Sequence, residues 1–175
     1  MPFYRPNISI LLAYIVIGLT FSAILFVAIS IGTTHWIHTK NIRGGLWTLC
    51  HVQPLACFHS ITRSPAALSL TGLGFILLAF TSTFIFDILD WHLLVPIKCL
   101  SFISVGSLGL GAFFLTMSYT AFARLTAQFG YSLYLMIVAQ LFATTAAIVA
   151  SYLQGRRHIL SCPSVIMTRL EVRRT

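Results

Sequence analysis

The sequence predicts an all-α membrane protein: a four-helix transmembrane bundle that carries a small extracellular antiparallel β-sheet. Three observations lead to this fold class. The chain of 175 residues is 58% hydrophobic and only 8% charged, whereas charged residues make up about 25% of an average soluble domain. Four long runs contain no charged residue and no histidine. Between the first two runs lies a polar loop with strand-forming residues, two adjacent glycines and two cysteines.

The four uncharged runs predict four membrane spans within one membrane domain, residues 8–153. Each run is long enough to cross about 30 Å of hydrocarbon as a helix. The first run is also longer than the roughly 7–15 apolar residues of a signal peptide, so we expect it to be retained as a span. The spans are about 8–31, 66–86, 99–119 and 131–153, with outer loops at 32–65 and 122–130 and a polar turn at 87–98.

Basic residues in the two tails predict the orientation of the chain in the membrane. The tail of residues 154–175 contains five arginines, and the short tail of residues 1–7 contains Arg5. Basic residues that flank spans favour the cytoplasmic side. We therefore expect a multi-pass protein of the plasma membrane, at cell junctions, with both termini in the cytoplasm and both loops outside.

The first outer loop carries the features that predict the sheet. Three short strands are expected, over residues 35–40, 46–52 and 57–61, with turns at Gly44-Gly45 and at Pro54. Cys50 and Cys57 lie seven positions apart in this loop. A disulfide between them is predicted, and closing so short a loop would stabilise it by about 2–3 kcal/mol. The alternative is two unpaired, buried cysteines.

The same loop shows a family resemblance. The residues that carry it are Trp36, Gly45, Leu46, Trp47, Cys50 and Cys57. They resemble the W…GLW…C…C signature of the claudin superfamily. That superfamily includes claudins, peripheral myelin and epithelial membrane proteins, the lens fibre membrane intrinsic protein, and claudin-like auxiliary subunits of calcium channels and AMPA receptors. A second segment, Phe129-Gly130-Tyr131-Ser132-Leu133-Tyr134, is similar to an aromatic segment of the myelin, epithelial and auxiliary branches.

The resemblance implies a non-enzymatic protein that organises cell–cell contacts or membrane architecture through its first extracellular loop. The alternative is an auxiliary subunit that regulates an ion channel or receptor by lateral helix packing. The partners implied are membrane lipids, further copies or other claudin-like proteins, or a channel or receptor. The uncharged spans argue against a pump or transporter, which usually needs charged groups at membrane depth. No cofactor, metal or nucleic acid is expected.

Charged and aromatic residues of the first loop suggest two further roles. Lys40 and Arg43 are candidates for charge selectivity if the loop lines a paracellular path, because fixed positive charge attracts anions. The alternative is that both are solvated charges with no pore nearby. Trp36 and Trp47 are interpreted as interfacial anchors, whose rings are buried at the membrane face while their N–H groups stay hydrated.

Small residues recur every four positions along one side of the last span. They are Ala139, Ala143, Ala147 and Ser151. Small residues let helix backbones approach closely in lipid, so they predict a packing face, within the monomer or between monomers. In the basic tail, Cys162 is a candidate for palmitoylation.

Overall fold

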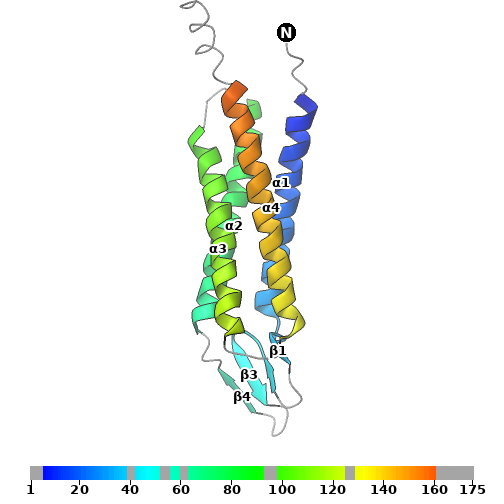
Figure 1. Ribbon diagram of the computed structural model, residues 1–175, viewed down its shortest axis with the longest axis vertical. Helices are drawn as coiled ribbons and strands as arrows, with labels where there is room; N and C mark the ends of the chain where they lie inside the picture. The colour runs from blue at the N-terminus through cyan, green and yellow to red at the C-terminus, as the bar shows by residue number, and fades with distance from the viewer. Residues whose placement is uncertain are drawn as a thin grey trace, which may run out of the picture.

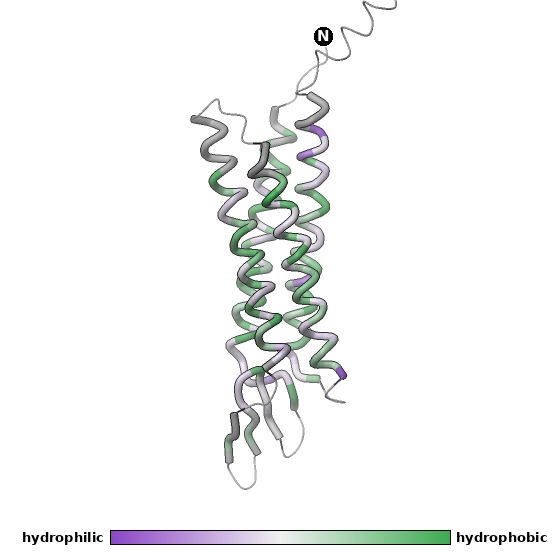
Figure 2. Tube along the Cα trace, turned by 90° about the vertical axis from the view of Figure 1, so that its left-hand side faces the viewer, coloured by the Kyte–Doolittle hydropathy of each residue, from purple (hydrophilic) through white to green (hydrophobic). Residues whose placement is uncertain are grey.

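The computed structural model describes residues 6–38, 42–51, 56–59, 63–92, 98–124 and 129–160. Four long helices form an elongated bundle, and four short strands lie at one end of it (Figure 1). The helices are α1 (Pro6–Gly32), α2 (Arg63–His92), α3 (Lys98–Ala123) and α4 (Tyr131–Leu160). Each is long and apolar enough to cross a membrane, and hydrophobic residues predominate along the middle of the bundle in Figure 2. The prediction of four helices that are long and apolar enough to span a membrane is confirmed.

The helices extend beyond the predicted spans at three places. The loop expected from residue 122 begins later, because α3 includes Phe122 and ends at Ala123. The polar turn expected at 87–98 is shorter, because α2 continues to His92 and α3 begins at Lys98. Helix α4 also extends past residue 153 to Leu160. Hydropathy marks the part of a helix that suits lipid, whereas backbone hydrogen bonding continues into the polar turns beyond it.

The strands are β1 (Ile37–His38), β2 (Ile42–Gly44), β3 (Thr48–His51) and β4 (Ala56–His59). They form one antiparallel sheet in the order β1-β2-β3-β4. Three strands were expected in this loop, and β2 is the additional one. Gly44, expected in a turn, pairs in β2 with Ile37 on one side and with Leu49 on the other.

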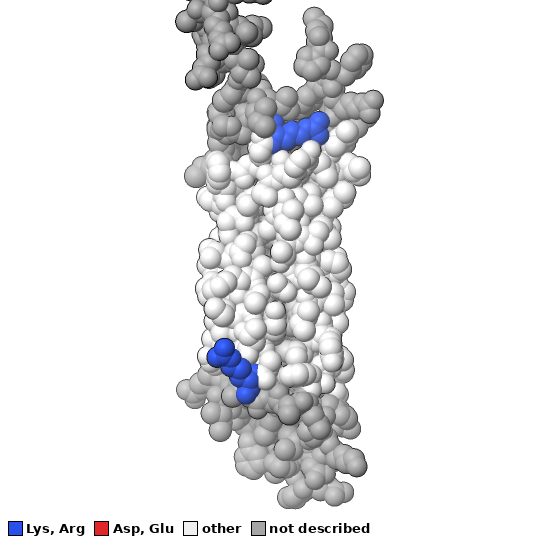
Figure 3. Space-filling view, viewed as in Figure 1, with Lys and Arg blue, Asp and Glu red and all other residues white. Residues whose placement is uncertain are grey.

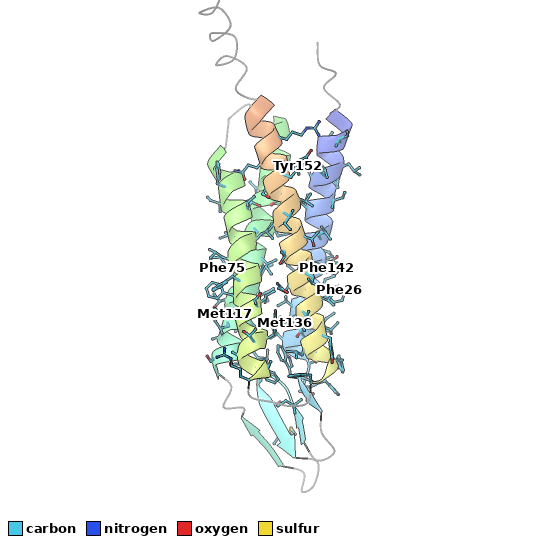
Figure 4. The ribbon with its side chains drawn as sticks, viewed as in Figure 1. Phe26, Phe75, Met117, Met136, Phe142 and Tyr152 are labelled. Carbon is cyan, nitrogen blue, oxygen red and sulfur yellow. A yellow bond between two sulfur atoms is a disulfide. The ribbon has the colours of Figure 1, made fainter. Side chains whose placement is uncertain are left out.

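The bundle consists of two closely packed helix pairs, α2 with α3 and α1 with α4. In the first pair the backbones approach at two glycines: a Cβ on Gly72 would lie 3.2 Å from the Gly111 carbonyl oxygen, and one on Gly111 would lie 3.2 Å from the Gly72 carbonyl oxygen. In the second pair the rings of Phe26 and Phe142 stack with their centroids 5.6 Å apart (Figure 4).

The predicted small-residue face of α4 is only partly a packing face of the monomer. Ala139 and Ala143 are fully buried, Ala147 is half-buried and Ser151 is exposed. Ser151 therefore does not pack within the monomer, and for this residue the predicted contact between monomers stays a prediction. A step of four residues turns about 400°, so the ladder drifts about 40° per step and Ser151 lies about 120° around the helix from Ala139. The buried stripe passes through Ala146 and Leu153 instead.

Candidate functional site at the junction of bundle and sheet

Two tryptophan side chains cap the last carbonyls of α1, at the end of the bundle that carries the sheet. The final C=O groups of a helix lack partners within the helix. The Trp36 Nε1–H donates to the Ser30 carbonyl at 2.7 Å, and the Trp47 Nε1–H donates to the Ile31 carbonyl at 3.0 Å. The two tryptophans therefore tie the first residues of the sheet region to the end of the helix that precedes it.

Trp36 lies in the core of the junction. It is 0% exposed, and its ring meets the ring of Phe122 edge-on with centroids 4.8 Å apart. Its backbone N–H donates to the Gly44 carbonyl at 2.8 Å. The interpretation of Trp36 as an interfacial anchor is therefore wrong, because its N–H is satisfied inside the protein. Trp47 is 43% exposed, which suits an interfacial position.

The Gly45-Leu46-Trp47 motif has a distinct physical role at each position. A Cβ on Gly45 would lie 2.9 Å from the Thr33 carbonyl oxygen and 2.9 Å from the Thr34 Cα, so the backbone contact requires glycine. Leu46 is 1% exposed and belongs to the main core cluster. Trp47 supplies the second cap. The motif therefore holds the sheet against the end of α1.

The segment at the start of α4 contacts the backbone at His35 and Trp36, just after the residues that Gly45 contacts. The Gly130 N–H donates to the Trp36 carbonyl at 2.8 Å. A Cβ on Gly130 would lie 1.8 Å from the His35 carbonyl oxygen, so the backbone before α4 can lie here only without a side chain. Next to it, the Tyr131 ring stacks on His35 with centroids 4.9 Å apart, and the Tyr131 hydroxyl is 3.2 Å from His35 Nδ1.

A hydroxyl network joins the sheet end of α1 to the first turn of α4. The Ser30 Oγ–H donates to the Ser132 carbonyl at 2.7 Å. The hydroxyls of Thr33 and Ser132 are 2.6 Å apart. Ser30 and Ser132 are both fully buried, where a hydroxyl without a partner would be costly. We call the whole arrangement the junction: Ser30, Thr33, His35, Trp36, Gly45, Leu46, Trp47, Phe122, Gly130, Tyr131 and Ser132.

Cys50 and Cys57 form a disulfide, with an S–S distance of 2.10 Å. They are directly opposed on β3 and β4, with Cα atoms 4.0 Å apart. Arg43 lies on β2, and its backbone is paired with that of Cys50. Lys40, Pro54 and Cys162 lie outside the described residues. The roles predicted for Lys40, Arg43 and Cys162 stay predictions.

Basic side chains occur near the two ends of the bundle face that Figure 3 shows, and none occurs over its middle. Arg124 follows α3 at the sheet end, and Arg156 lies on α4 towards the opposite end. Within the described ranges there is no group of three or more histidine, cysteine or acidic residues that could hold a metal ion.

Comparisons with known protein families and with curated protein sequences find no match.

Proposed function

We propose that this chain is a non-enzymatic, claudin-like integral membrane protein that organises cell–cell contacts or membrane architecture through its sheet, which lies on the extracellular side. The observation that carries the proposal is the junction. Hydrogen bonds from Trp36 and Trp47 to α1, and from Gly130 to Trp36, fix the sheet to the bundle at three points.

A fixed sheet favours recognition by another macromolecule. A surface that is already ordered loses little conformational entropy on binding, so more of the contact energy is available as affinity. The disulfide restrains the outer pair of strands further. A loop needed only to connect two spans would require neither the buried indole of Trp36 nor the two backbone contacts that admit only Gly45 and Gly130.

The function is tested by where the protein accumulates when expressing cells touch. Cells that produce a fluorescently labelled copy are mixed with cells that produce a differently labelled copy and with cells that produce none. Accumulation where two expressing cells meet is expected, with no accumulation where an expressing cell meets a non-expressing one. An even distribution over the cell surface in both cases would remove the support for a role in cell–cell contact.

The proposed orientation gives a separate prediction. Helix α1 begins and α4 ends at the end of the bundle opposite the sheet (Figure 1), which supports the proposal that both termini lie on one side of the membrane. With the basic tail in the cytoplasm, a tag at either terminus should bind antibody only after the cells are permeabilised. Binding of antibody to either tag on intact cells would contradict this orientation.

The alternative function, an auxiliary subunit of an ion channel or receptor, is favoured by one observation. Gly18 on α1, Gly74 on α2 and Gly106 on α3 are exposed, and a Cβ at each would meet nothing within 4 Å. Exposed glycines let a neighbouring membrane helix approach closely. Crosslinking in native membranes separates the two functions, because a channel recovered in stoichiometric amount would favour the auxiliary role.

A further inference from the structure

A polar side chain of α4 has no hydrogen-bond partner at membrane depth. Gln140 is half-buried, and its side-chain amide bonds to none of the residues that the structure describes. Its backbone carbonyl accepts from the Thr144 hydroxyl at 2.8 Å, but that bond leaves the amide free. Among the described side chains, the fully buried polar atom without a partner is Gln154 Nε2. The Gln140 amide, which has no partner either, is therefore not fully enclosed by the described part of the bundle.

The depth of Gln140 makes this unpaired amide costly. The apolar part of α4 begins at Tyr131, nine residues before Gln140. At 1.5 Å per residue the two are about 14 Å apart along the helix, which is close to half of a hydrocarbon layer of about 30 Å. No water is available there, so an amide without a partner costs several kcal/mol. An amide at this position favours a partner within the membrane.

The neighbours of Gln140 allow a second helix to approach. Thr144 and Ala147 are half-buried and Ser151 is exposed. At about 100° per residue, all three lie within about 40° of Gln140 around the helix. We call these four residues the Gln140 face. The three members that follow Gln140 in the chain are small residues. Helix–helix interfaces in membranes are enriched in such residues. Ser151 has no packing role in the monomer core, and its exposure leaves it free to contact a second helix on this face.

We propose that the Gln140 face pairs with the Gln140 face of a second copy of this chain. Copies inserted in the same membrane share one orientation, so their α4 helices run parallel and their Gln140 residues lie at the same depth. A carboxamide contains both a donor and an acceptor, so two Gln140 side chains related by a two-fold axis satisfy each other with reciprocal hydrogen bonds. This lateral contact rests on the membrane placement of α4 and is independent of what the sheet contacts.

The test measures association of the full-length protein in phosphatidylcholine vesicles. Donor-labelled and acceptor-labelled copies are reconstituted together, and energy transfer is recorded over a series of protein-to-lipid ratios in dilute vesicles. Interhelical hydrogen bonds in membranes contribute about 0.6–2 kcal/mol, so Gln140→Leu should weaken association about threefold to thirtyfold. Ser151→Leu, which puts a bulky side chain on an exposed position of the face, should weaken it as well.

Thr145→Val is the matched control. Thr145 is exposed, its hydroxyl bonds to the Leu141 carbonyl of its own helix, and it lies about 140° around the helix from Gln140. It should leave association unchanged, and circular dichroism should show equal helix content for all three variants. A wild-type chain that stays monomeric, a Gln140→Leu or Ser151→Leu variant that associates like wild type, or an equal loss in Thr145→Val overturns the proposal.

One further outcome also overturns pairing between copies. If the wild-type chain does not self-associate but captures a different membrane protein in a Gln140-dependent way, the amide serves that partner instead. Because the vesicle measurement reports lateral contacts only, it leaves the cell-contact experiment unaffected, and the two proposals can fail separately.

Discussion

Gly130→Ala is expected to disrupt the junction and to lower the free energy of unfolding by about 3 kcal/mol or more. The added Cβ would lie 1.8 Å from the His35 carbonyl oxygen and 2.6 Å from the His35 carbonyl carbon. Both are backbone atoms next to Trp36, which is held by hydrogen bonds at its N–H and its C=O. Overpacking alone costs about 1–3 kcal/mol, and moving α4 away also breaks the Gly130–Trp36 hydrogen bond, worth about 1 kcal/mol.

Alanine substitutions at two other glycines should give smaller losses of stability. Gly45→Ala puts a Cβ 2.9 Å from the Thr33 carbonyl oxygen, so it should be less damaging than Gly130→Ala but still destabilising. Gly106→Ala meets nothing within 4 Å on the exposed side of α3, and it should be neutral or slightly stabilising because alanine is the better helix former. Unfolding by denaturing detergent, followed by circular dichroism, measures all three. Equal stability of the Gly130 and Gly106 variants would show that the close approach is not rigid.

The four spans were predictable because the signal is local. A membrane helix must present apolar side chains along about 20 residues, so an uncharged run identifies it without knowledge of its neighbours. The ends of the helices carry no such constraint. Hydropathy predicts a loop at Phe122, yet this residue lies in α3, where its ring packs against Trp36, 86 positions earlier in the chain.

The junction could be recognised as a motif but not explained from the sequence. The sequence shows Gly45-Leu46-Trp47 and Gly130-Tyr131-Ser132 as patterns. It does not show that Gly45 contacts the backbone at Thr33–Thr34 and Gly130 the backbone at His35–Trp36, because these contacts depend on how distant parts of the chain pack. The hydrogen bond between Ser30 and Ser132 could not be predicted, because a serine in an apolar run is common and the two residues lie 102 positions apart. The two tryptophans look alike in sequence, and the sequence does not show that Trp36 is buried, with its ring against Phe122, while Trp47 is exposed.

Trp36→Ala is expected to cost about 3–5 kcal/mol of folding free energy, the range for removing a large buried aromatic side chain. Against a total stability of roughly 5–15 kcal/mol, this loss should leave much of the protein unfolded. Trp36→Phe separates the hydrogen bond from the packing, because phenylalanine keeps an aromatic ring beside Phe122 and removes the Nε1–H. Among the described residues, the Ser30 carbonyl then keeps the Thr33 hydroxyl as its partner, at 3.2 Å, and about 1–3 kcal/mol of folding free energy should be lost.

Trp47→Phe is the matched control for Trp36→Phe, because it deletes the same donor from a second α1 carbonyl. Trp47 is 43% exposed and Trp36 is 0% exposed. At the partly exposed Trp47 site, water or a lipid headgroup can replace the lost donor, so the cost should stay below about 1 kcal/mol. Detergent-induced unfolding of the two variants side by side gives the difference. An equal loss at both positions would mean that burial of the junction does not set the strength of the caps, and that the sheet is held mainly by the backbone contacts of Gly45 and Gly130.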